Sequence, residues 1–101
     1  MEIEYNDIKD KKEFVFDGDL LIQKECVDED NKIYVYERYY QGSFLYAYEV
    51  VRGIKRKNPS GRIIYKYPSS EEFGKYGYFL PVKSKNRIPE YVKMLQDSIK
   101  K

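Results

Sequence analysis

A cluster of positively charged side chains is the feature of this sequence best suited to recognising a partner. Residues 52–66 hold six basic side chains and no acidic one, namely Arg52, Lys55, Arg56, Lys57, Arg62 and Lys66. Several Lys and Arg side chains on one projecting segment can contact phosphate groups and release their counterions. The segment therefore predicts a surface that binds nucleic acid or an acidic protein surface. Its alternative is a hairpin whose charges only solubilise the chain.

Tyrosine is unusually abundant, with twelve copies in 101 residues. Alternation along the expected strands places Tyr34, Tyr36 and Tyr65 on the less apolar side of a sheet. Aromatic rings on such a side can stack on nucleic-acid bases. The alternative is that they form a half-buried second face that packs against the N-terminal arm. The sequence is compatible with both interpretations, base stacking and a half-buried second face.

The acidic residues gather at the other end of the chain. Residues 1–30 carry eleven acidic and four basic side chains, whereas residues 31–101 carry fifteen basic and six acidic ones. Asp28, Glu29 and Asp30 are consecutive in this acidic part. A negative surface can mimic phosphate charge and occupy a basic groove on another protein. The second hypothesis is therefore that the chain inhibits a host nucleic-acid-binding protein through this acidic region. The alternative is that the three acidic residues form a solvated turn.

Most catalytic and metal-binding schemes lack their usual residues here. The chain has no histidine, a single cysteine, Cys26, and no glycine-rich phosphate motif. Histidine is the commonest general base near neutral pH and the commonest metal ligand. We therefore expect a non-catalytic protein with no metal and no cofactor. The lone Cys26 predicts a small buried apolar side chain and a reducing, cytoplasmic setting, and no apolar run is long enough for a membrane span.

Three extended segments, 19–27, 32–40 and 43–52, must position the tyrosines and the start of the basic cluster. They are rich in β-branched and aromatic residues and are separated by turn residues, so they predict an antiparallel meander. Two-residue turns would place Val35 opposite Tyr48, Ile33 opposite Val50 and Cys26 opposite Ile33. One face is then apolar, with Leu20, Ile22, Cys26, Ile33, Val35, Tyr39, Phe44, Tyr48 and Val50. The other holds Gln23, Glu25, Tyr34, Tyr36, Arg38, Ala47 and Glu49.

The segment after Gly53 predicts a long-looped hairpin that carries the basic cluster. Residues 54–61 read as its loop and residues 62–67 as a fourth strand. A short helix follows, in which Ser69 and Glu72 form a capping box and Gly74 ends the helix. Residues 77–82 are expected to form a short fifth strand.

The segment from Arg87 to the C-terminus predicts the longest helix. Pro89 suits the first helical position, and one stripe collects Ile88, Tyr91, Val92, Leu95 and Ile99. This stripe can cover the apolar face of the sheet. The expected fold is therefore α+β, an antiparallel sheet of four to five strands packed against one C-terminal helix. It forms a single domain over 1–101. Residues 1–16 are unassigned, and a short helix, an edge strand and a less ordered arm are all open for them.

One stretch, residues 48–79, resembles a pattern in short uncharacterised proteins of bacteriophages and prophages. The pattern is a Tyr-Glu-Val strand, a basic variable loop and a second element, which here comprises Tyr67, Pro68, Ser69, Ser70, Phe73, Gly74, Gly77 and Tyr78. Such sequences often carry Trp where this chain has Phe73 and Tyr78. The resemblance implies a small phage-type protein and brings no activity or catalytic residues with it.

Overall fold

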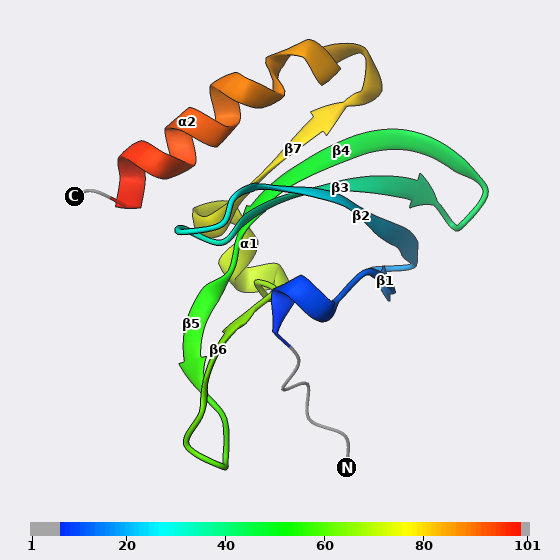
Figure 1. Ribbon diagram of the computed structural model, residues 1–101. Coiled ribbons are helices and arrows are strands. Elements are labelled where there is room, and N and C mark those ends of the chain that lie inside the picture. The colour runs from blue at the N-terminus through cyan, green and yellow to red at the C-terminus, as the bar shows by residue number, and fades with distance from the viewer. Residues whose placement is uncertain (1–6, 100–101) are drawn as a thin grey trace.

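Five antiparallel strands form the central sheet of the protein, in the order β1-β2-β3-β4-β7 (Figure 1). In the computed structural model, which describes residues 7–99, they are β1 (Glu13–Phe16), β2 (Asp19–Asp28), β3 (Ile33–Tyr40), β4 (Phe44–Arg52) and β7 (Gly77–Pro81). Strands β5 (Ile54–Lys57) and β6 (Ile63–Lys66) form a separate two-stranded sheet. The helices are α1 (Ser70–Tyr76), α2 (Ile88–Ile99) and the short 3₁₀ helices η1 (Ile8–Asp10) and η2 (Val82–Arg87). The α+β class, with an antiparallel sheet and a C-terminal helix, is confirmed.

The segment before β2, which the sequence left unassigned, supplies the first edge of the sheet. Strands β1 and β2 pair with Phe16 opposite Asp19, so a two-residue turn joins them. Both turn residues, Asp17 and Gly18, have positive φ (53° and 83°). Turns of this kind match the right-handed twist of a hairpin, and Gly is tolerated there because it lacks Cβ. Of the expected arm, residues 1–6 lie outside the described residues.

One face of the sheet packs against α2. Its buried residues are aliphatic, with Ile33, Val35, Val50 and Leu80 from the strands and Leu95 from the helix. The other members of the expected helix stripe pack against the same cluster, namely Ile88, Tyr91, Val92 and Ile99. The prediction that this stripe covers the apolar sheet face is therefore confirmed.

The opposite face of the sheet is also buried, and its core is mostly aromatic. Tyr34 and Tyr36 of β3 pack there with Leu21, Val51 and Tyr67, and Phe14 and Phe16 lie against them. Ile8 of η1 closes this cluster and is fully buried. The sheet thus has two cores, and the face that was expected to be the less apolar one is also buried.

The expected pairing of segment 32–40 with segment 43–52 is wrong. Away from the loop that joins them, the pairing of β3 with β4 differs from it by two residues. The loop is three residues long, since Tyr40 pairs with Phe44, and Tyr46 is an extra residue in β4 between the pairs Tyr39–Leu45 and Arg38–Ala47. Val35 therefore faces Val50 instead of Tyr48. A shift of two preserves which face each inner side chain occupies. Phe44, expected in the apolar core, is 58% exposed.

Irregularities in β2 change the surroundings of the cysteine. Register shifts at Lys24 and Val27 place Cys26 opposite Tyr34 and not opposite Ile33. Cys26 is exposed, so the prediction of a buried cysteine is wrong. An extra residue in one strand reverses the side-chain alternation beyond it, and no sequence signal marked these two positions.

The segment after β4 contains a strand that the sequence analysis missed. Residues 54–57 were expected in a loop, but they pair with β6 from Ile54–Lys66 to Lys57–Ile63. The capping box of Ser69 and Glu72 is confirmed, although α1 passes Gly74 and ends at Tyr76. Gly74 does not have the positive φ of a glycine that ends a helix, so the helix continues through it. Within residues 7–99, no helix has the length and apolar content that crossing a membrane requires.

Candidate functional site

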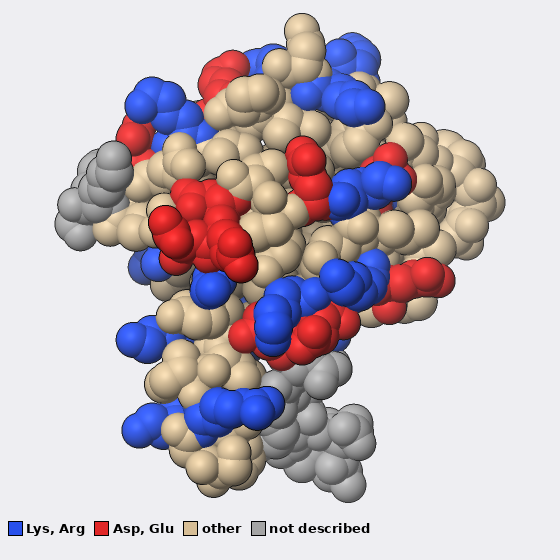
Figure 2. All heavy atoms as spheres, in the orientation of Figure 1, with Lys and Arg blue, Asp and Glu red and all other residues tan. Residues whose placement is uncertain are grey.

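The basic cluster lies on a ribbon formed by β5 and β6 that projects from the body of the protein (Figure 1). Its tip is ordered by Asn58, whose side-chain oxygen accepts hydrogen bonds from the backbone N–H groups of Ser60 (3.1 Å) and Arg62 (2.9 Å). The Ser60 hydroxyl donates to the same oxygen at 2.7 Å. Figure 2 shows Lys and Arg side chains on the outer half of this ribbon and no acidic side chain on its visible side.

One side of the ribbon is fastened to α1. Strand alternation and pairing put Arg56 and Lys66 on the same side as the buried Ile54 and Ile64. Both cations contact one carboxylate, with Arg56 Nη2 at 3.0 Å and Lys66 Nζ at 2.9 Å from the two oxygens of Glu72. The backbone N–H of Ser69 and the Lys66 ammonium lower the pKa of Glu72 to about 2. Two positive charges thus share one negative charge.

The remaining basic residues are more available to a partner. Lys55 and Lys57 lie on the other side of the ribbon, Arg62 lies in its loop, and all three are exposed. Among the described residues, none of these three forms an ion pair. Arg52, at the end of β4, is half-buried and places its guanidinium 5.3 Å from the ring centre of Tyr76. The structure therefore divides the six basic residues into three exposed, two shared with Glu72 and one stacked on a ring.

Two of the three candidate tyrosines are parts of the core. Tyr34 is 5% exposed and Tyr36 is fully buried, so the prediction that their rings are available for stacking is wrong. The Tyr36 hydroxyl donates to the backbone oxygen of Lys11 at 2.8 Å and accepts from Gln23. Tyr65 is half-buried, and the Lys32 ammonium lies 5.1 Å from its ring centre. The alternative reading, a second face packed against the N-terminal segment, describes Tyr34 and Tyr36.

The three consecutive acidic residues, Asp28, Glu29 and Asp30, also differ in how available they are to a partner. Asp28 accepts hydrogen bonds from the side chains of Asn31 and Gln96, both at 2.8 Å, and the bond from Asn31 is the main cause of its lowered pKa. Since Gln96 belongs to α2, Asp28 helps attach the β2–β3 turn to that helix. Glu29 and Asp30 are exposed. Only these two are available for the acidic interface that the sequence suggested.

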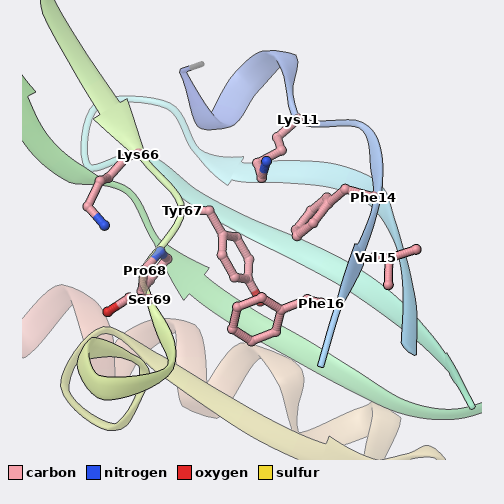
Figure 3. A pocket seen from close by; sticks show the side chains of 8 residues that line it. All are labelled: Lys11, Phe14, Val15, Phe16, Lys66, Tyr67, Pro68 and Ser69. Carbon is pink, nitrogen blue, oxygen red and sulfur yellow. The ribbon is translucent and has the colours of Figure 1, made fainter. Parts of the chain in front are cut away.

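A cleft that the sequence analysis did not predict opens beside the base of the ribbon. It has a volume of about 280 Å³ and lies between β1 and the connection from β6 to α1 (Figure 3). The rings of Phe14, Phe16 and Tyr67 point toward one another there, whereas Val15 points away. The described residues that line it are Lys11, Phe14, Val15, Phe16, Lys66, Tyr67, Pro68 and Ser69. The alternation of phenylalanines two residues apart was the only sequence signal for this wall.

A network of buried polar groups holds Tyr67, one of the residues that line the cleft, in place. The Tyr67 hydroxyl donates to one oxygen of the fully buried Glu49, and Arg38 donates to the other. Arg38 also donates to Asp19 at 2.9 Å, and Tyr46 donates to the same carboxylate at 2.5 Å. Burial raises the pKa of Glu49, while the bonds from Tyr67 and Arg38 oppose that shift. The network satisfies its buried charges internally, as a structural cluster does.

Residues 7–99 contain no group of three or more His, Cys, Asp or Glu side chains arranged to hold a metal ion. Comparison of the chain with protein-family models, with curated proteins and with solved structures gives no match.

Proposed function

We propose that this chain is a non-catalytic nucleic-acid-binding protein whose β5–β6 ribbon contacts the phosphate backbone. The observation that carries the proposal is the exposure of Lys55, Lys57 and Arg62 on a projecting ribbon, with no ion pair to another described residue. Unpaired cations on a protruding element can replace condensed counterions along a nucleic-acid strand. A reducing, cytoplasmic setting, favoured by the single cysteine, accords with such a target.

The distribution of acids supports the basic ribbon over the acidic surface as the working interface. Asp19 is committed to Arg38 and Tyr46, and Asp28 to Asn31 and Gln96. Arg38 compensates the charge of Asp19, and the bonds from Asn31 and Gln96 occupy an oxygen of Asp28, so both carboxylates are less available to a partner. The ribbon keeps three of its five cations exposed without an ion pair to another described residue.

The test is the salt dependence of binding, measured by fluorescence anisotropy with labelled single- and double-stranded DNA and RNA. We expect binding that weakens steeply as salt rises. The triple variant Lys55→Gln, Lys57→Gln, Arg62→Gln should lower the slope of log K against log salt concentration by about two to three, since each phosphate contact contributes about 0.7 to 0.9.

A matched control removes the same charge elsewhere. Lys83, Lys85 and Lys93 are exposed on η2 and α2, at the end of the molecule opposite the ribbon (Figure 1). Replacing these three by Gln should leave the slope within about one of the wild type, because they make no contact in this proposal. Equal losses in both triple variants would show that only net charge matters and would overturn the ribbon as the interface.

The result that would overturn the proposal altogether is no binding to any of the four nucleic acids at low salt. If a protein partner is then retained, two variants separate the remaining possibilities. Loss of the partner in the ribbon variant would indicate an acidic protein surface. Loss in a Glu29→Lys, Asp30→Lys variant would favour the inhibitor hypothesis.

A further inference from the structure

The chemistry of the cleft beside β1 fits a flat, negatively charged ligand. Three aromatic rings, those of Phe14, Phe16 and Tyr67, line it together with the side chains of Lys11 and Lys66. Among the described residues that line it none is a carboxylate, and Lys66 is paired with Glu72 at the edge of the cleft. Tyr67 is buried, so the half-buried rings of Phe14 and Phe16 are the ones that can offer dispersion and stacking to a planar group, and ammonium groups favour an anion attached to it. A nucleotide unit has both parts, a base and a phosphate.

Contacts within the protein fix the side chains that form the walls of the cleft. The ring of Tyr67 meets those of Phe14 and Phe16 edge-on, with centroids 5.0 Å and 5.3 Å apart. The Tyr67 hydroxyl is held by buried Glu49, and Pro68 is fully buried. A ligand would therefore not have to order these side chains, which lowers the entropic cost of binding.

The cleft also joins the ribbon directly. Lys66 is the last residue of β6 and lines the cleft, and Arg56 shares the carboxylate of Glu72 with it. The ribbon strands are four residues long, so they span about 13 Å. A strand whose base enters the cleft would thus continue past further cations. Aromatic platforms next to a basic track are the usual arrangement for binding single strands.

Base pairing decides which nucleic acid can use such a cleft. In a duplex the faces of each base are covered by its stacked neighbours, and extruding one base costs a few kcal/mol. An unpaired base has no such cost. We propose that the cleft between β1 and the β6–α1 connection binds one unpaired base of a single-stranded nucleic acid, whose backbone follows the ribbon. This inference rests on the function proposed above and adds the class of substrate.

The first experiment uses the unaltered protein and two probes of equal length and charge. One is a labelled single-stranded DNA of twelve thymidines, and the other replaces every nucleotide by an abasic analogue. We expect the abasic strand to bind about five- to a hundredfold more weakly, the range for stacking of one base. Equal affinities for the two strands would overturn the inference while leaving the ribbon as a phosphate-binding element.

A matched pair of variants locates the effect. Phe16→Leu removes a ring from the cleft, whereas Phe44→Leu removes an exposed ring at the start of β4 that does not line the cleft. We expect Phe16→Leu to bring the affinity for the thymidine strand close to that for the abasic strand, with abasic binding unchanged. Phe44→Leu should behave as wild type. The opposite pattern would place base stacking at Phe44 and overturn the assignment.

A measurement that needs no variant covers the case in which Phe16→Leu does not fold. Thymidine monophosphate titrated into the labelled wild-type protein should shift the NMR signals of Phe14, Phe16 and Tyr67 more than those of Phe44 and Phe79. Shifts at the cleft with a short acidic aromatic peptide, and none with the nucleotide, would make it a peptide site and overturn the inference. If no nucleic acid binds at low salt, the proposed function fails and this inference fails with it.

Discussion

The two faces of the central sheet are stabilised in different ways. Against α2, Ile33, Val35, Val50 and Leu80 form an aliphatic layer with Leu95. On the opposite face, aromatic rings surround Glu49, Arg38 and Asp19, and the hydroxyls of Tyr36 and Tyr67 donate to specific acceptors. The first face depends on shape and apolar area, whereas the second depends on particular donors and acceptors.

Adjacent residues of β4 make the contrast direct. Glu49 and Val50 are both fully buried and lie on opposite faces of the same strand. A buried aliphatic layer tolerates exchange of one apolar side chain for another of similar volume. A buried polar network does not, because each removed partner leaves another group unsatisfied. The cleft and the base of the ribbon belong to the second face, so the less tolerant face is the one that carries the candidate site.

The largest effect is expected when a side chain of nearly identical shape replaces Glu49. In Glu49→Gln the Arg38 guanidinium loses one of its two carboxylate partners inside the protein. We expect a loss of about 3 kcal/mol in the free energy of unfolding, measured with urea. Glu37→Gln is the control, because that half-buried carboxylate lies 3.9 Å from Lys24, and it should cost less than about 1 kcal/mol. Similar losses in both variants would remove the contrast between the faces.

A smaller effect is expected on the aliphatic face when, as at Glu49, the new side chain has nearly the same volume as the original one. Leu95 is 1% exposed and lies in the middle of the stripe on α2. Leu95→Met keeps its volume and should cost less than about 1.5 kcal/mol, again from urea unfolding. Leu95→Ala should cost about 2–5 kcal/mol because it leaves a cavity. If Leu95→Met proved as costly as Glu49→Gln, packing on this face would be as specific as the polar network.

The smallest effect is expected in the pH dependence of stability that comes from Asp19. Hydrogen bonds from Tyr46, Gln41 and Arg38 hold the pKa of Asp19 at about 2, below the ordinary value of 3.8. Because the folded-state pKa is the lower one, this stabilisation is complete above about pH 4 and is lost as pH falls through about 2. In Asp19→Asn, thermal unfolding midpoints should therefore decline less than those of the wild type between pH 5 and pH 2.

Glu72 provides the comparison for this pH effect. Its pKa is also about 2, but its partners belong to the ribbon and to the start of α1. Glu72→Gln should flatten the same acid limb independently of Asp19→Asn, and the double variant should add the two changes. If the pH profile of Asp19→Asn coincided with that of the wild type, the ionised Asp19 carboxylate would add nothing to the stability of the folded protein.

Local signals in the sequence were sufficient for most of the elements, although β1 was left unassigned and β5 was expected to be a loop. Alternating β-branched and aromatic residues located β2, β3 and β4, and Ser69 with Glu72 located the start of α1. The stripe through Leu95 identified the buried side of α2. Each of these signals acts over a few residues, so neighbouring side chains alone determine it.

Register and burial depended on interactions that the sequence does not display. The extra residues at Lys24, Val27 and Tyr46 follow from how whole strands fit together. The six basic residues were found by charge alone, but only the fold reveals that Glu72 holds Arg56 and Lys66. The cleft was missed because its two walls, around Phe14 and Tyr67, are some fifty positions apart in the chain and meet only after folding.

The continuity of β4 into β5 has a mechanical consequence. Only Gly53 separates the two strands, so no loop lies between them. The backbone at Gly53 packs closely on Tyr65, since a Cβ there would lie 2.9 Å from the Cβ of Tyr65. β4 is paired with β3 on one side and β7 on the other. A pull on the ribbon is transmitted along β4, across which the hydrogen bonds to both neighbours run. These bonds would bear the load in parallel, so tension on a bound strand would be resisted by the middle of the sheet.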